Sequence, residues 1–458
     1  MRSGYPPRRV CAAMNDIQAA GATLGEPLGT VLRGVASSAS NSKMLKRVLA
    51  VSCSLPYPPE IQTHGMFQRL DMLVEAVSSL AERVDLLFFA PPELADAKVR
   101  ARVRQALAVK YATEIDVTIA PAGGGPRESF YNQLVAGTLG IAHQSGYAPY
   151  CQPQPLRALG EAVAKGPELI LVHRLSAMVP LLRLRQPLSP VIFDLDDIEH
   201  RALFRHLMTA TGWWMRKLLM IHTPAVAVAE IQAVRRTWAT LVCSETDCRY
   251  LQRLVGRKCR LAVIPNAVDV PAEEGGRKES SVVLFVGAFS HPPNIQAANE
   301  LTELVWPLIK RKVSSAELII AGKNPENILA FRRPGNDLHV LGFVPDLNQI
   351  YRRAAVVCCP IRSGSGTRIK IIEASSRGVP VVSTKLGAEG LAYRDDQEIM
   401  IRETPEALAD ACVRLLQDET LRRDIGQAAR ARTVTLYDRG IIVDRVRSLM
   451  AEAAGVAR

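Results

Sequence analysis

The chain has 458 residues, of which 48% are hydrophobic, and its formal net charge is +12. This length exceeds the size at which a single hydrophobic core stops growing, so we expect two domains. No run reaches the ~18 consecutive apolar residues that a membrane-spanning helix needs, which argues against a helical integral membrane protein.

The first 43 residues combine Arg, Gly and Ser without the apolar core of a signal peptide. We expect residues 1–43 to form a disordered N-terminal extension. Nine cysteines are scattered along the chain without any CxxC pair. This usage is typical of a reduced, cytoplasmic protein whose cysteines mostly fill the core.

From residue 46 onward, short apolar runs rich in β-branched residues alternate with helical stretches. The predicted strands are 46–53, 84–89, 115–120, 168–172, 191–194 and 240–244, then 281–289, 316–321, 338–341, 355–360 and 380–384. Strands that alternate with helices indicate parallel sheets covered on both faces. We therefore predict an α/β protein with two Rossmann-like domains and a cleft between them. The predicted domains are 44–265 and 266–438, followed by a helix at 439–458 that has no sheet partner in its own half and could cross back to the first domain.

Residues 360–391 (PIRSGSGTRIKIIEASSRGVPVVSTKLGAEGL) hold the most informative pattern. A loop with Gly364 and Gly366 precedes a helix predicted over 369–376. Unpaired N–H groups and the helix dipole favour an anion at such an N-terminus, and glycine lets the backbone approach it. Glu373, one turn into the helix, would repel a phosphate and is placed to accept hydrogen bonds from sugar hydroxyls. Phosphate plus polyol predicts a nucleotide.

Several further motifs stand in a fixed order along the chain. Together with 360–391 they are LPYPPEIQTHG (55–65), VIPNAVD (263–269), FVGAFSHPPN (285–294) and LGFVPDL (341–347). In this order they resemble the retaining family 4 glycosyltransferases (glycosyl transferases group 1) of the GT-B fold, and several ordered motifs are far more specific than one. The resemblance implies an acceptor-side domain at 44–265 and a nucleotide-sugar-binding domain at 266–438. It also implies hexosyl transfer from a UDP- or GDP-sugar to an acceptor hydroxyl, with retention, no metal and no cofactor.

The resemblance also implies roles for single residues. Glu373 matches the acid that binds the donor ribose, and Gly65 matches the glycine that approaches the diphosphate from the N-terminal domain. His173, at a strand end, looks like the histidine near the transferred sugar, although a strand-end histidine satisfied by the backbone has the same pattern. The other implied donor contacts are Gly287, Asn294, Gly342, Val344, Gly364, Ser365, Gly366 and Thr367.

The sequence departs from the family at charged positions. Ser365 stands where many members have a second acid, and Ala288 and Asn294 stand where many have a basic pair. Two phosphates in a partly dry cleft need cationic partners. Our hypothesis is that Arg368 and Lys370 take over this role and stabilise the departing diphosphate; the alternative is a solvated helix face.

Two further clusters are ambiguous. DLDDIEH (194–200) could bind magnesium, but we favour aspartates that cap the following helix and line the cleft. The stretch 201–221 combines basic residues with Trp213 and Trp214, as an interfacial amphipathic helix or a core helix would. Residues 44–265 carry seven of the twelve net positive charges, which favours, slightly, contact with an anionic membrane surface.

The leading interpretation is a cytoplasmic or peripheral glycosyltransferase that acts on a glycolipid or polysaccharide precursor. An epimerase or phosphorylase on the same fold would use water or phosphate instead of an acceptor. A non-catalytic nucleotide-sugar-binding scaffold is the alternative from another class. Nucleic-acid binding is disfavoured because the basic segment contains no reading helix or aromatic RNA-binding motif.

Overall fold

The computed structural model describes residues 44–57, 65–123, 130–185, 188–209, 218–272, 281–332 and 335–455. The expected N-terminal extension, residues 1–43, lies outside these ranges, as do residues 58–64 of the first motif.

The first domain is built on a parallel sheet of seven strands in the order β3-β2-β1-β4-β5-β6-β7. These strands are β1 (Leu45–Ser52), β2 (Ala81–Ala90), β3 (Glu114–Pro121), β4 (Leu169–His173), β5 (Val191–Asp196), β6 (Ala239–Val242) and β7 (Leu261–Val263). Its helices are α2 (Gly65–Leu80), α3 (Ala97–Tyr111), α4 (Phe130–Leu139), α5 (Pro153–Ala164), α6 (Leu175–Leu182), α7 (Glu199–Thr209), α9 (His222–Arg236) and α10 (Glu245–Val255).

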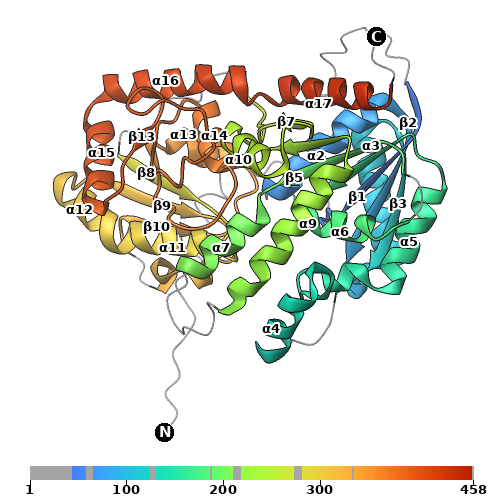
Figure 1. Ribbon diagram of the computed structural model, residues 1–458. Helices are drawn as coiled ribbons and strands as arrows, with labels where there is room; N and C mark the ends of the chain where they lie inside the picture. The colour runs from blue at the N-terminus through green and yellow to red at the C-terminus, as the bar shows by residue number, and fades with distance from the viewer. Residues whose placement is uncertain are drawn as a thin grey trace. The chain divides into compact units, whose positions relative to one another are not determined.

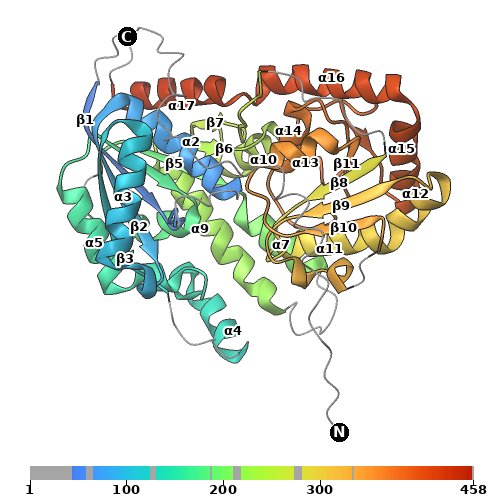
Figure 2. The same ribbon diagram turned by 180° about the vertical axis from the view of Figure 1, so that it is seen from behind.

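The second domain repeats this architecture with a parallel sheet of six strands in the order β10-β9-β8-β11-β12-β13 (Figures 1 and 2). The strands are β8 (Val282–Val286), β9 (Glu317–Ala321), β10 (Leu338–Leu341), β11 (Val356–Cys359), β12 (Val381–Ser383) and β13 (Met400–Ile401). The helices are α11 (Pro292–Glu300), α12 (Trp306–Lys312), α13 (Leu347–Arg353), α14 (Ile369–Ser376), α15 (Pro405–Gln417) and α16 (Glu419–Leu436). The prediction of two parallel, Rossmann-like sheets is confirmed.

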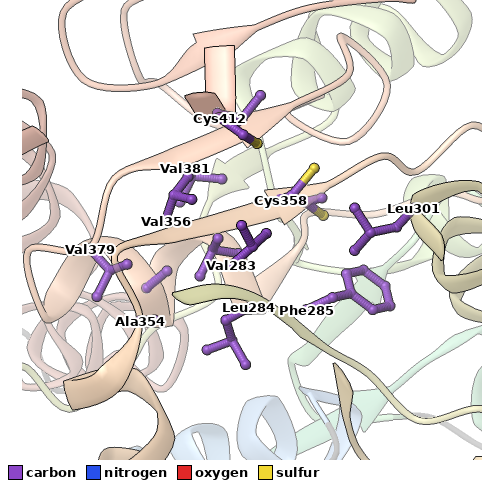
Figure 3. Packing of buried hydrophobic residues seen from close by; sticks show 14 of the residues in the cluster. Val283, Leu284, Phe285, Leu301, Ala354, Val356, Cys358, Val379, Val381 and Cys412 are labelled. Atoms are coloured by element: carbon purple, nitrogen blue, oxygen red, sulfur yellow. The ribbon is translucent and has the colours of Figure 1, made fainter. Parts of the chain in front are cut away.

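The packing of the second domain's core explains why its strands could be predicted from continuous apolar runs in the sequence. Figure 3 shows Val283, Leu284 and Phe285 of β8 packed near Cys358 of β11 and Cys412 of α15, all at most 1% exposed. Helices cover both faces of a parallel sheet, so its strands are continuously apolar rather than alternating.

The last helix, α17 (Arg439–Ala453), packs against α2 of the first domain. Its fully buried side chains Ile442, Val446 and Met450 belong to the same hydrophobic cluster as the core of α2 and β1. The Arg439 guanidinium donates to Glu75 Oε2 (2.6 Å) and Asp71 Oδ2 (2.7 Å), both on α2. The helix that follows the second domain therefore packs against the first domain.

Strand order in each sheet reverses direction at one place, between β1 and β4 and between β8 and β11. Ligands of open α/β sheets bind beyond the carboxyl ends of the strands at this switch point. In the second domain, the loops that leave the switch point are 287–291 and 360–368. In the first domain, the corresponding loops follow Ser52 at the end of β1 and His173 at the end of β4. The motifs at 55–65, 285–294 and 360–391 follow strands at the switch points, whereas VIPNAVD and LGFVPDL follow the edge strands β7 and β10.

Candidate active site

The two loops at the second switch point are joined by Lys370 of α14. Its Nζ donates to Asn294 Oδ1 (2.8 Å), and Asn294 Nδ2 donates in turn to the carbonyl oxygen of Ala288 (2.9 Å). A methyl group at Gly287 would lie 3.1 Å from Lys370 Nζ. Glycine at this position therefore leaves room for the ammonium group. Asn294, which carries no charge, positions that group by accepting its hydrogen bond.

Burial changes the acid–base properties of Lys370. Desolvation lowers the pKa of its ammonium group to about 8. The ammonium nitrogen also lies 4.4 Å from the centroid of the Phe285 ring, at cation–π distance. The charged form thus relies on Asn294 and the Phe285 ring, and it would gain from an anionic ligand.

Arg368, the residue immediately before α14, is 9% exposed. Its Nη1 donates to the carbonyl oxygens of Ser365 (2.5 Å) and Gly366, so the guanidinium fixes the loop that precedes the helix. Its Nη2 is buried and has no hydrogen-bond partner among the residues that the structure describes. A methyl group at Gly364 would lie 3.6 Å from this Nη2, so the unpartnered group lies beside the glycine loop.

Glu373 lies one turn into α14 and receives hydrogen bonds from both domains. Gln68 Nε2 of α2 donates to its Oε1 (3.2 Å), and Tyr351 Oη donates to its Oε2 (3.3 Å). Burial raises the pKa of the Glu373 carboxyl group, and the bond from Gln68 opposes this rise. A carboxylate with two neutral donors can exchange them for the hydroxyl groups of a ribose.

His173 ends β4 and is completely buried. Its Nδ1 lies 2.9 Å from Asp194 Oδ2, while its Nε2 has no hydrogen-bond partner. Burial alone would raise the pKa of Asp194, but the adjacent Arg69 charge and the bonds from His173 and Arg69 lower it to about 2. The ionised aspartate thereby orients the imidazole.

Arg69, on α2, connects this pair to the second domain. The Arg69 guanidinium donates to Asp194 Oδ1 (2.5 Å) and to Asn266 Oδ1 (3.2 Å). Asn266 Nδ2, from the VIPNAVD motif, then donates to Thr367 Oγ1 (2.8 Å). A buried chain of hydrogen bonds therefore runs from the first switch point to the loop before α14.

Asp197 lies against the glycine loop from the first domain. A methyl group at Gly366 would overlap Asp197 Oδ1 and lie 2.9 Å from its Cγ, and Gly366 has φ of +75°. Both facts require glycine here. Burial and the Asp196 charge raise the pKa of Asp197 to about 7. The expectation that the DLDDIEH segment faces the other domain agrees with this contact.

The expectation that an aspartate of this segment caps the next helix is wrong. The backbone N–H groups of Glu199 and His200, at the start of α7, donate to Glu230 Oε1 at 2.6 and 3.4 Å. Glu230 comes from α9 and is fully buried. The cap is therefore a tertiary contact, which the local sequence pattern could not reveal.

The basic residues of α7 contact an acidic residue of the second domain. The Arg205 guanidinium donates to both carboxylate oxygens of Glu389 (2.5 and 2.8 Å), and Arg201 Nη2 donates to Glu389 Oε1 (3.5 Å). These arginines join the two domains. Trp213 and Trp214 lie outside the described residues.

Three further residues predicted to contact the donor are Gly65, Gly342 and Val344. Gly65 begins α2. Gly342 follows β10, and its carbonyl oxygen accepts from the N–H of Gly322 (3.1 Å). Val344 packs against the core of the second domain. The carboxyl ends of β8, β9 and β10 thus bring Gly287, Gly322 and Gly342 together.

Sequence reasoning missed Arg69, Gln68 and Tyr351 as site residues. Each reaches the site from a distant segment, and no local pattern marks it. Asn266 could have been predicted as a site residue, because it lies within the VIPNAVD motif. Among the described residues, no group of three or more His, Cys, Asp and Glu side chains could hold a metal ion. No helix in the described ranges is long and apolar enough to cross a membrane.

Two Rossmann-like domains in series, each built on a parallel sheet, are the architecture of the GT-B fold. Residues 280–418 match the family described as Glycosyl transferases group 1. The matched segment covers most of the second domain and includes the motifs at 285–294, 341–347 and 360–391.

Solved structures with a similar fold support the assignment of the GT-B fold. Sucrose-phosphate synthase from Thermosynechococcus elongatus superposes with a TM-score of 0.63 at 17% identity, covering 89% of this chain and 98% of that one. Anabaena HepE in complex with UDP-glucose gives a TM-score of 0.59 at 14% identity, covering 89% and 99%. At these identities the comparison shows the fold.

Among curated proteins, the chain is similar to mycobacterial phosphatidyl-myo-inositol mannosyltransferases. The protein of Mycobacterium leprae is 27% identical over 49% of this chain and 63% of its own length. The protein of Mycolicibacterium smegmatis is 28% identical over 42% of this chain and 52% of its own length. The match thus spans between about half and two thirds of these relatives.

Proposed function

We propose that this protein is a glycosyltransferase that moves a sugar from a nucleoside-diphosphate sugar to an acceptor hydroxyl group. The observation that carries the proposal is the pair of cations at the start of α14, the buried Arg368 and the half-buried Lys370. Arg368 Nη2 has no hydrogen-bond partner among the described residues, and Lys370 Nζ donates to the neutral side chain of Asn294. A buried cationic group whose hydrogen bonds are incomplete is costly. A diphosphate between the glycine loop and α14 would supply the missing negative charge.

The donor class follows from what surrounds these cations. Glu373 offers a carboxylate to a ribose, and the backbone near Gly342 and Val344 is available to a base. A UDP- or GDP-sugar is the donor we propose, and the name of a similar structure, HepE with UDP-glucose, supports a nucleotide sugar. The names of the mycobacterial relatives support a lipid-linked acceptor.

In the mechanism we propose, the acceptor oxygen attacks the anomeric carbon from the face that the diphosphate leaves. The bond from this carbon to the diphosphate oxygen breaks while the bond to the acceptor oxygen forms, and the acceptor proton passes to the diphosphate. Retention follows from this geometry. Arg368, Lys370 and the loop amides stabilise the departing charge, and His173 Nε2 binds a hydroxyl group of the transferred sugar. No step uses a metal ion.

A thermal-shift screen of UDP-, GDP- and ADP-sugars tests the donor, because a ligand that binds only the folded protein raises its melting temperature. The stabilising donor is then incubated with candidate acceptors, with and without EDTA, and the anomeric configuration of the product is determined by NMR. We expect transfer with retention that EDTA leaves unchanged. Donor turnover without acceptor would favour the epimerase or phosphorylase alternative, and tight binding without turnover would favour a scaffold.

We further propose that the enzyme contacts an anionic membrane at the inner face. Exposed apolar side chains on α7 and the turn before α9 support this: Phe204, Met208, Leu218 and Ile221 are each more than 40% exposed. Flotation with vesicles containing anionic lipid, compared with purely zwitterionic vesicles, is the test. Protein that stays at the bottom with both would remove this part of the proposal.

A further inference from the structure

The segment 366–373 presents charges in a definite order. Asp197 lies against Gly366 at one end, the cations Arg368 and Lys370 follow, and the Glu373 carboxylate lies at the other end. A nucleotide sugar has the complementary order of polyol, diphosphate and polyol. Glu373 was placed at the ribose. The Asp197 carboxylate, at the opposite end, then faces the position of the transferred sugar.

The Asp197 carboxylate has room for a ligand. No hydrogen bond from a described residue reaches it, and its side chain is partly exposed. Arg174 and Arg368 attract it electrostatically, whereas Asp196 and Glu199 repel it. A carboxylate in such surroundings would repel a phosphate but accept hydrogen bonds from hydroxyl groups.

A second observation points to a ligand at the same place. The Nη2 of Arg368, buried and without a hydrogen-bond partner among the described residues, lies beside Gly364 of the loop whose Gly366 contacts Asp197. Asp196, the residue before Asp197, is strained with φ of +60°, and Arg174 after β4 has φ of +73°. Left-handed conformations in non-glycine residues cluster at functional sites.

We propose that Asp197 is a specificity-determining residue that receives hydroxyl groups of the transferred hexose, supplying from the first domain a carboxylate that the loop itself lacks. Ser365 leaves the loop without an acid, and the contact at Gly366 brings Asp197 next to it. The inference rests on the proposed function, since it requires a nucleotide-sugar donor.

The test compares the affinities of the donor selected by the thermal-shift screen and of its free nucleoside diphosphate, by calorimetry. In Asp197→Asn we expect the affinity for the nucleotide sugar to fall by about 10- to 100-fold, as for other hydrogen bonds to charged groups. The affinity for the free diphosphate should stay the same or rise, because a repelling charge is removed. Asp196→Asn is the matched control: Asp196 is engaged with Arg69 and Arg174, so any loss should affect both ligands equally.

Equal losses for both ligands in Asp197→Asn, or no loss for either, would overturn the inference. If no nucleotide sugar stabilises the wild-type protein, the proposed function fails first, so the two failures are distinguishable. If Asp197→Asn does not fold, the pH dependence of donor affinity in the wild-type protein tests the same inference. Because Asp197 ionises near pH 7, facing Asp196, Glu199, Arg174 and Arg368, affinity for the nucleotide sugar should rise from pH 6 to pH 7.5. A flat profile counts against the inference.

Discussion

The ammonium group of Lys370 lies between Asn294 Oδ1 and the ring of Phe285, with a pKa lowered to about 8 by burial. The charged form is the one that binds a diphosphate. In the free protein this form is complete below pH 7 and is lost as the pH rises through 8. We therefore predict that affinity for a nucleoside diphosphate falls between pH 7.5 and pH 9.5, which calorimetry across this range would measure.

Lys370→Arg provides the control for this pH dependence, because a guanidinium remains charged over the whole range. Its affinity profile should be flat above pH 7.5, even if its absolute affinity is lower. Lys370→Met should bind weakly at every pH. A wild-type profile that parallels that of Lys370→Arg would show that Lys370 does not contact the diphosphate.

Glu373 gives a prediction that contrasts with that for Asp197. In Glu373→Gln we expect the free nucleoside diphosphate and the nucleotide sugar to lose affinity by the same factor, about 10-fold or more, because both ligands contain the ribose. Calorimetry with the two ligands measures this. Tyr351→Phe removes only a donor to Glu373 and should change either affinity by less than Glu373→Gln. A loss confined to the nucleotide sugar would contradict the ribose assignment.

Site residues could be predicted from the sequence where several of them lie close together in one segment of the chain. Arg368, Lys370 and Glu373 occupy one short segment, so a loop and helix pattern placed them together. Arg69 and Asn266 are 197 positions apart, and their contact depends on how α2 packs against the end of the sheet. No spacing rule encodes such a contact.

Among the helices, α17 allows a direct test of how the end of the chain contributes to stability. Met450 is fully buried against the core of the first domain. Met450→Ala should lower the free energy of unfolding by about 2–5 kcal/mol through lost burial and the cavity left behind. Urea denaturation monitored by circular dichroism measures it. Ile441→Ala on the same helix, where the side chain is 39% exposed, is the control and should cost much less. Equal effects would show that α17 is not anchored through Met450.

Elements were predictable in proportion to their length and apolar continuity. The long strands β1 and β2 and the helix α14 were expected at nearly their observed positions. β7 and β13, with three and two residues, were not. The three-residue β12 was predicted because its residues lie in an apolar run that follows a Gly-x-Pro sequence. The start of α7 was misread because its cap, Glu230, comes from another helix.

For the whole molecule, the decisive contacts are those that join the two domains. Gln68 bonds to Glu373, Asn266 bonds to Thr367, and Arg205 bonds to Glu389. The first two touch the residues assigned to the donor, so binding and domain contact involve the same groups. The hydrogen bond from Arg205 is the main cause that lowers the pKa of Glu389. This ion pair lies outside the donor contacts and can therefore be altered without removing them.

Breaking this pair should weaken donor binding by shifting molecules away from the joined arrangement, since apparent affinity scales with the competent fraction. A partly exposed pair contributes about 1 kcal/mol at most, so Arg205→Gln should raise the Kd of a nucleoside diphosphate by up to about fivefold. Glu389→Gln removes this pair and the weaker pair with Arg201 (3.5 Å), so its effect should be at least as large. The double variant should match Glu389→Gln, because its second substitution breaks no further pair between the domains. Arg402→Gln, which removes pairs within the second domain only, should leave Kd unchanged. Additive losses in the double variant, or a loss in Arg402→Gln, would show that the domain contact does not control binding.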